Sequence, residues 1–163
     1  MDNAEFARKV FADAVDLMNK VSSPPEFRAK QANTKEWVYG YFAPMFFVDN
    51  DNNVSHISPA IITVDLERWH AEPVDPETVG QYSGKDDNNG EKMFEGDIVK
   101  GLFLHGSSIL SVVTFKDGAF GLEWNRGTVK TFSAFTSICN VTYEKIGNIH
   151  DNPELLKEGV DIG

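Results

Sequence analysis

Five carboxylate side chains lie close together in one short stretch of the chain, GKDDNNGEKMFEGDIVKG, over residues 84–101. They are Asp86, Asp87, Glu91, Glu95 and Asp97. Carboxylates at this density could bind a divalent cation, carry out acid–base chemistry, or simply belong to a turn that leads into a strand. The spacing of the residues bears on all three interpretations.

Calcium binding in an EF-hand loop requires oxygen ligands at positions 1, 3 and 5, glycine at position 6 and glutamate at position 12. With Gly90 at position 6, Asp87 and Asn89 stand at ligand positions, but a lysine occupies position 1 and a glycine position 12. The DNDNN cluster over residues 49–53 also lacks its glycine and its final acid. We therefore predict no metal site and interpret the Asn-Asn-Gly run as a tight reversal.

Glu95 and Asp97 are two residues apart just before an apolar strand, so their side chains could face one pocket. An aspartate at the start of a strand more often accepts hydrogen bonds from nearby backbone N–H groups. We favour that structural role, and whether the two acids also contact a ligand stays open.

Other catalytic patterns are missing from the sequence. The four histidines are far apart, no phosphate-binding glycine loop is present, and HGSSI over residues 105–109 lacks the second glycine of a nucleophile turn. Cys139 is the single cysteine, in a mostly apolar run, which is typical of a buried residue. We predict a protein that is not an enzyme, with no catalytic residues and no cofactor.

The charge distribution argues against a polyanionic partner. The formal net charge is −10, and residues 65–97 carry ten acids against three basic residues. A nucleic-acid backbone or an anionic membrane surface would be repelled by the molecule as a whole. Residues 98–149 are mildly basic and contain interleaved aromatic rings, so nucleic-acid binding through Lys116, Arg126 and Lys130 is the disfavoured alternative.

The N-terminal residues 3–21 have helical periodicity. Apolar side chains fall on one half of the helix surface, and polar ones fill the other half. The SSPP run over residues 22–25 ends the helix. Either this helix packs on its own domain, or it forms a seam with another copy or a partner, and in the second case the contact residues include Phe6, Val10, Leu17 and Val21.

The rest of the chain is punctuated by Gly, Pro, Asn and Asp in the manner of short strands. We predict a helical extension over residues 1–23 and one domain over 24–163. That domain would contain a β region over 24–79, a small barrel over 80–149, and a short helix and tail over 150–163. Five strand-like runs after residue 96 suit a barrel, because closure removes exposed sheet edges. The predicted fold class is α+β, mainly β.

Three separated motifs, in order, resemble one known family. They are VDPETVGQYSG (74–84), DNNGEKMFEGDIVKG (87–101) and KIGNIHDNPELL (145–156), with an upstream echo in FRAK and EWVYGYF. Together they resemble the YopX family of phage and prophage proteins, over residues 26–157. The resemblance implies a protein made inside a bacterium whose C-terminal half is an SH3-like barrel. It implies no activity and no site residues.

These observations lead to one functional hypothesis. The protein would be a non-enzymatic, self-associating binding or assembly module that acts on a host or phage protein; the alternative is a nucleic-acid-binding SH3-like barrel. No apolar run approaches the roughly 18 residues that a membrane span needs, and the N-terminus lacks the basic start of a secretory signal. We therefore expect a cytoplasmic location in the bacterial host and no membrane partner.

Overall fold

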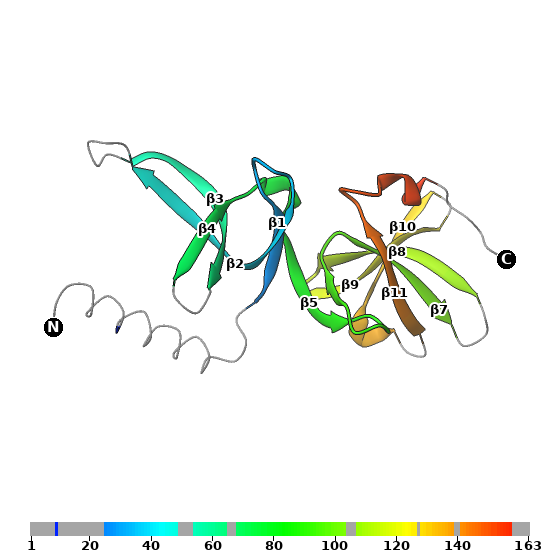
Figure 1. The fold of residues 1–163 in the computed structure, drawn as a ribbon. Helices are drawn as coiled ribbons and strands as arrows, with labels where there is room; N and C mark the ends of the chain where they lie inside the picture. The colour runs from blue at the N-terminus through cyan, green and yellow to red at the C-terminus, as the bar shows by residue number, and fades with distance from the viewer. Residues whose placement is uncertain are drawn as a thin grey trace.

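A computed structural model describes residues 9, 25–48, 54–64, 68–103, 107–126, 128–138 and 141–157. They form two antiparallel β-sheets, one of six strands and one of five. Figure 1 shows β2, β3 and β4 of the six-stranded sheet at one end of the molecule and the five-stranded sheet at the other, with β1 and β5 between them.

The six-stranded sheet has the order β4-β3-β2-β1-β5-β6. Its strands are β1 (Phe27–Lys30), β2 (Trp37–Val48), β3 (Val54–Val64), β4 (Trp69–Pro73), β5 (Gly80–Asp86) and β6 (Lys92–Phe94). A small core of Ala29, Ile61 and Val74 lies on one face of this sheet, with Phe27 and Val38 packed against it.

The five-stranded sheet has the order β10-β9-β8-β7-β11. Its strands are β7 (Asp97–Phe103), β8 (Ser108–Lys116), β9 (Ala119–Arg126), β10 (Val129–Ala134) and β11 (Val141–Asn148). Three 3-10 turns complete the described structure: η1 (Pro76–Thr78), η2 (Phe135–Ser137) and η3 (Pro153–Leu156). The larger of the two described cores contains Val99, Val113, Leu122 and Tyr143 of this sheet together with Met93 from β6.

The predicted fold class, α+β with an SH3-like barrel, is wrong for the described part of the chain. The named elements there are strands and 3-10 turns of three or four residues. The barrel is not closed, because β10 and β11 are the two edges of the five-stranded sheet. After β10 the chain passes through η2 and returns beside β7, so the last strand extends the opposite edge. Apart from Lys9, the residues of the helix predicted over 3–21 lie outside the described part of the chain.

One local prediction is confirmed, and two turns also have local causes. The five strand-like runs after residue 96 form β7 to β11. Asp75 caps η1, since its side chain accepts a hydrogen bond from the backbone N–H of Glu77. In the β8–β9 hairpin, Asp117 and Gly118 both have positive φ, at 52° and 82°. Such a pair of left-handed residues matches the twist of the flanking strands.

A buried ion pair joins the two sheets. Arg28 on β1 is 4% exposed, Asp97 at the start of β7 is fully buried, and Arg28 Nη2 lies 2.6 Å from Asp97 Oδ1. The guanidinium carbon lies 4.6 Å from the centre of the Trp37 ring and 5.2 Å from that of Phe94. The other oxygen, Asp97 Oδ2, accepts a hydrogen bond from the Phe94 backbone N–H at 2.8 Å. Burial raises the pKa of Asp97, and the Arg28 charge opposes that rise.

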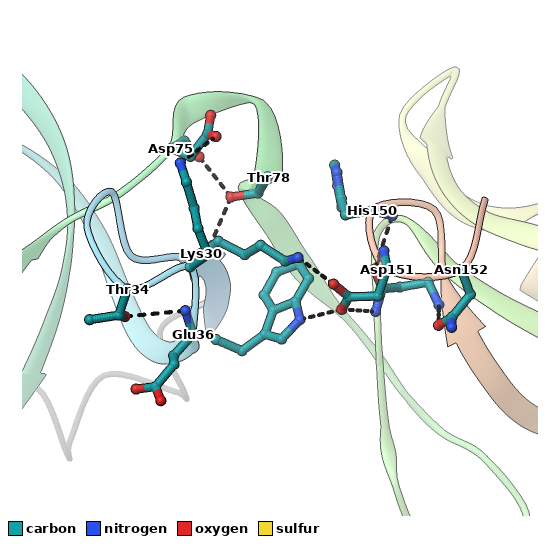
Figure 2. A network of polar contacts seen from close by, with 11 residues as sticks. Lys30, Thr34, Glu36, Asp75, Thr78, His150, Asp151 and Asn152 are labelled. Atoms are coloured by element: carbon teal, nitrogen blue, oxygen red, sulfur yellow. Dashed lines mark hydrogen bonds and ion pairs between the residues drawn. The ribbon is translucent and has the colours of Figure 1, made fainter.

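A second polar link lies beside the first, nearer the surface. Figure 2 shows Lys30 reaching from β1 toward Asp151, with which it forms an ion pair. Asp151 Oδ2 also accepts hydrogen bonds from Trp37 Nε1 at 2.7 Å and from Asn148 Nδ2 at 2.8 Å. The hydrogen bond from Lys30, followed by those from Asn148 and Trp37, holds the pKa of Asp151 well below its usual range, although burial works against this. These contacts tie the segment after β11 to the six-stranded sheet.

Breaking the buried pair should destabilise the protein strongly. We expect Arg28→Met or Asp97→Asn to cost about 3–5 kcal/mol in the free energy of unfolding, because each change leaves one buried charge unpaired. The double variant should lose less than the sum of the two, since no unpaired charge remains. Urea denaturation measures all three. Lys35→Gln, which removes an exposed ion pair with Asp75, serves as the control and should cost less than about 1 kcal/mol. Additive losses in the double variant would contradict a coupled pair.

The link at Asp151 should weaken in acid. Its pKa is lower in the folded than in the unfolded chain, so the carboxylate stabilises the fold fully above about pH 4 and loses this effect as the pH falls toward the folded pKa. At neutral pH, we expect the free energy of unfolding of the unchanged protein to exceed that of Asp151→Asn by up to about 1 kcal/mol. The difference is small because the Asp151 carboxylate is partly exposed. Urea denaturation from neutral pH to about pH 3 should show this difference shrinking. A difference that stays constant over that range would argue against the ion pair.

Candidate functional site

The five carboxylates of residues 84–101 do not converge in space. They are distributed over β5, the turn after it, and the segment that leads from β6 into β7. Within the described ranges, no group of three or more His, Cys, Asp or Glu side chains is placed to hold a metal ion. The predicted reversal is confirmed: Gly90 has a φ of +79°, and its N–H donates to the carbonyl of Asp87.

Asp87 instead organises this turn. Its Oδ1 accepts hydrogen bonds from the backbone N–H groups of Asn89 at 2.8 Å and Glu91 at 2.9 Å. Its Oδ2 accepts one from the N–H of Lys145 on β11 at 3.0 Å. Burial alone would raise the pKa of Asp87, but these hydrogen bonds lower it below its ordinary value. Asp87 therefore attaches the turn to the five-stranded sheet, a role that sequence reasoning missed because Lys145 is distant along the chain.

Glu95 and Asp97 have separate environments. They flank Gly96, whose φ of +84° turns the chain from one sheet into the other. The Asp97 carboxylate contacts Arg28 and the Phe94 N–H, whereas Glu95 Oε1 lies 3.5 Å from the backbone nitrogen of Phe115. The expected hydrogen bond from a backbone N–H to Asp97 is confirmed, and the donor is Phe94. The other partner of the Asp97 carboxylate is Arg28 of the same chain.

The basic residues of the nucleic-acid alternative are partly brought together. Lys116 Nζ lies 3.7 Å from Glu123 Oε1, and Lys130 Nζ lies 2.8 Å from Glu123 Oε2. The hydrogen bond from Lys130, together with both positive charges, lowers the pKa of Glu123, which burial opposes. Two of the three basic side chains that would contact a nucleic-acid backbone, Lys116 and Lys130, thus pair with the same carboxylate, that of Glu123. The side chain of Arg126 lies outside the described structure.

The interaction residues predicted on the N-terminal helix, Phe6, Val10, Leu17 and Val21, are also outside the described residues, as is Cys139. The candidate surface that the structure does describe lies on β2 and β3. We call it the ribbon face and define it as the side chains of Phe42, Phe46 and Ile57, which are 40%, 61% and 60% exposed.

Strand register places these three side chains together. Phe46 is directly opposite Ile57, and Phe42 is opposite Ile61, so all four lie on one face of the sheet. Ile61 belongs to the small core of this sheet, and the rings of Phe27 and Phe42 are 5.7 Å apart. The ribbon face therefore continues the core outward without a polar interruption between Ile61 and Phe42.

The opposite face of the sheet has a different role. It carries Arg28, Lys30 and Trp37, whose side chains contact Asp97 and Asp151 in the other half of the molecule. One face of the six-stranded sheet thus contacts the second sheet near β1, although Tyr39 and Trp69 on that face are also 48% and 52% exposed. The other face leaves the ribbon face in solvent. The signal for this was present in the sequence, since YFAPMFF places apolar residues at both odd and even positions of β2. A strand of that kind is normally covered on both faces.

Comparisons with known proteins place the chain among related sequences and structures. A family model described as YopX protein matches residues 26–157. Protein EF1440 from Enterococcus faecalis is 27% identical, with a TM-score of 0.46, and the match covers 83% of this chain and 99% of that one. YopX from Bacillus subtilis is 17% identical, with a TM-score of 0.49, and the match covers 83% and 98%. No curated protein matches the sequence.

Among the described residues, no helix has the length and apolar character to cross a membrane.

A structural Asp87 can be distinguished from a calcium ligand by experiment. Asp87→Ala should lower the free energy of unfolding by about 2 kcal/mol or more, because three backbone N–H groups lose their acceptor. Asp86→Ala is the matched control; it removes a hydrogen bond from the Tyr82 hydroxyl at an exposed position and should cost less than about 1 kcal/mol. The midpoint temperature of thermal unfolding of the unchanged protein should be the same with calcium and with a chelator. A midpoint raised by calcium would contradict a purely structural role.

Proposed function

The chain belongs to the YopX family, and from this starting point we propose that it is a non-enzymatic protein-binding module that self-associates. In this proposal it is encoded by a phage or prophage, is made inside a bacterial cell, and acts on a host or phage protein. The family assignment itself specifies no activity. The observation that carries the proposal is the ribbon face.

The ribbon face has the chemistry of a contact surface. Covering a phenylalanine or isoleucine side chain is worth roughly 1.5–3 kcal/mol, and three such side chains stand together on the outer part of β2 and β3. Aromatic residues of this kind, clustered and well packed, supply most of the binding energy in protein interfaces. Pro44 and Pro59, directly opposite each other between Phe42 and Phe46, add no charge to the surface.

A second copy of the chain is the partner that suits this surface best. A symmetric dimer brings the same patch of two subunits together, and an uncharged apolar patch can meet itself without repulsion despite the net charge of −10. The described stretch that contains β1 starts at residue 25, and the Phe27 ring of β1 contacts Phe42. The amphipathic segment predicted from the sequence precedes β1 in the chain, and in this proposal its apolar residues add to the same interface.

Light scattering coupled to size-exclusion chromatography tests the proposal on the full chain. We expect a mass of two subunits or more for the unchanged protein and a monomer for Phe46→Ser combined with Ile57→Ser. Leu17→Ser should also weaken the association. Phe115→Ser is the matched control, since it removes an aromatic ring of 51% exposure from the other sheet; it should leave the mass unchanged. Self-association through this face would be overturned if the unchanged protein were a monomer. It would also be overturned if the variant with both Phe46→Ser and Ile57→Ser kept the oligomeric mass of the unchanged protein.

A further inference from the structure

A half-open, mainly apolar cavity lies in the five-stranded half of the molecule, away from the ribbon face, and its described polar lining consists of Ser111, Ser133 and Ser137. Its volume is about 320 Å³. The apolar part of its wall is formed by Ile109, Leu122, Trp124, Ile138 and Val141. These residues come from β8, β9, β11 and the segment after η2.

The open topology explains why there is space at this position. In a closed barrel, β10 and β11 would pair, and the sheet would surround its core. Here they are opposite edges, and the cavity wall includes Ser133 from β10 and Val141 from β11. The space therefore lies between the two edges that do not meet, next to the core residue Leu122.

One polar side chain in the wall lacks a partner. Ser111 on β8 is 1% exposed, and its Oγ makes no hydrogen bond within the described structure. It lies opposite Val99 and shares a face with Ile109 and Val113, so its hydroxyl points to the core side of the sheet. A buried hydroxyl without a partner costs free energy, and the rarity of such groups makes each one informative.

The chemistry of the wall defines what it could bind. None of the described residues that line the cavity is charged, and a charged ligand would be costly to bury against them. An apolar cavity of about 150 Å³ binds benzene, so this one has room for a ring with substituents. We propose that the cavity is a binding site for a small neutral molecule, mostly apolar, with one hydrogen-bonding group that pairs with the Ser111 hydroxyl.

Phenol and toluene are suitable probes because they have nearly the same shape and differ in one hydroxyl group. Titration of the full chain with each, followed by NMR of isoleucine, leucine and valine methyl groups, should shift the signals of Ile109, Leu122 and Val141. Phenol should bind about fivefold more tightly than toluene, the ratio that a net hydrogen bond supports. Absence of shifts at these methyl groups with both probes would overturn the site.

Ser111→Ala tests the role of the hydroxyl. This variant should bind phenol and toluene equally, with the toluene affinity unchanged, and the ligand-free protein should unfold at a higher temperature because an unpaired buried group has been removed. Ser108→Ala, on the same strand but absent from the cavity wall, should keep the fivefold preference. A phenol preference that survives in Ser111→Ala would rule out the proposed pairing. Phe46→Ser should leave all these affinities unchanged, so the result is independent of self-association.

Discussion

The pairing of Arg28 with Asp97 is the constraint on which the arrangement of the two sheets depends. Both side chains are removed from water, and a buried charge is tolerated only beside an opposite one. β1 of the first sheet must therefore lie next to the start of β7 in the second. The Trp37 and Phe94 rings contact the guanidinium as well, so its position is defined by packing and by charge. Lys30 and Asp151 extend the same contact toward the surface.

This junction divides the first sheet into two faces with different tasks. The face that contacts the second sheet carries Arg28, Lys30 and Trp37, whose partners are Asp97 and Asp151. The other face begins with a small core and ends in Phe42, Phe46 and Ile57, which are exposed. Two acids of the carboxylate-rich stretch also make contacts within the chain. Asp97 pairs with Arg28, and Asp87 accepts a hydrogen bond from the Lys145 backbone. The ribbon face is therefore the described surface on which the proposed self-association depends.

Short-range features were predictable from sequence, and the reason is that their causes are local. The Asn-Asn-Gly reversal, the Asp75 cap with Pro76, and the strands of the second sheet follow from residues a few positions apart. The closed barrel was predicted wrongly because strand number and spacing do not specify which edges meet. The route of the chain after η2 decided that β11 pairs with β7, and the cavity near Ser111 follows from this open arrangement.

The order of residues was thus enough to establish the family, the strands of the second sheet and the turn at Gly90, since each depends on motifs or hydrogen bonds within a short span. It also showed that β2 is apolar on both sides, although not which side would remain uncovered. Folding in three dimensions decided that Asp97 meets Arg28, that Asp87 meets the Lys145 backbone, and that Ser111 is buried without a partner. These contacts join segments far apart in the chain, and no local pattern encodes the distance between such segments.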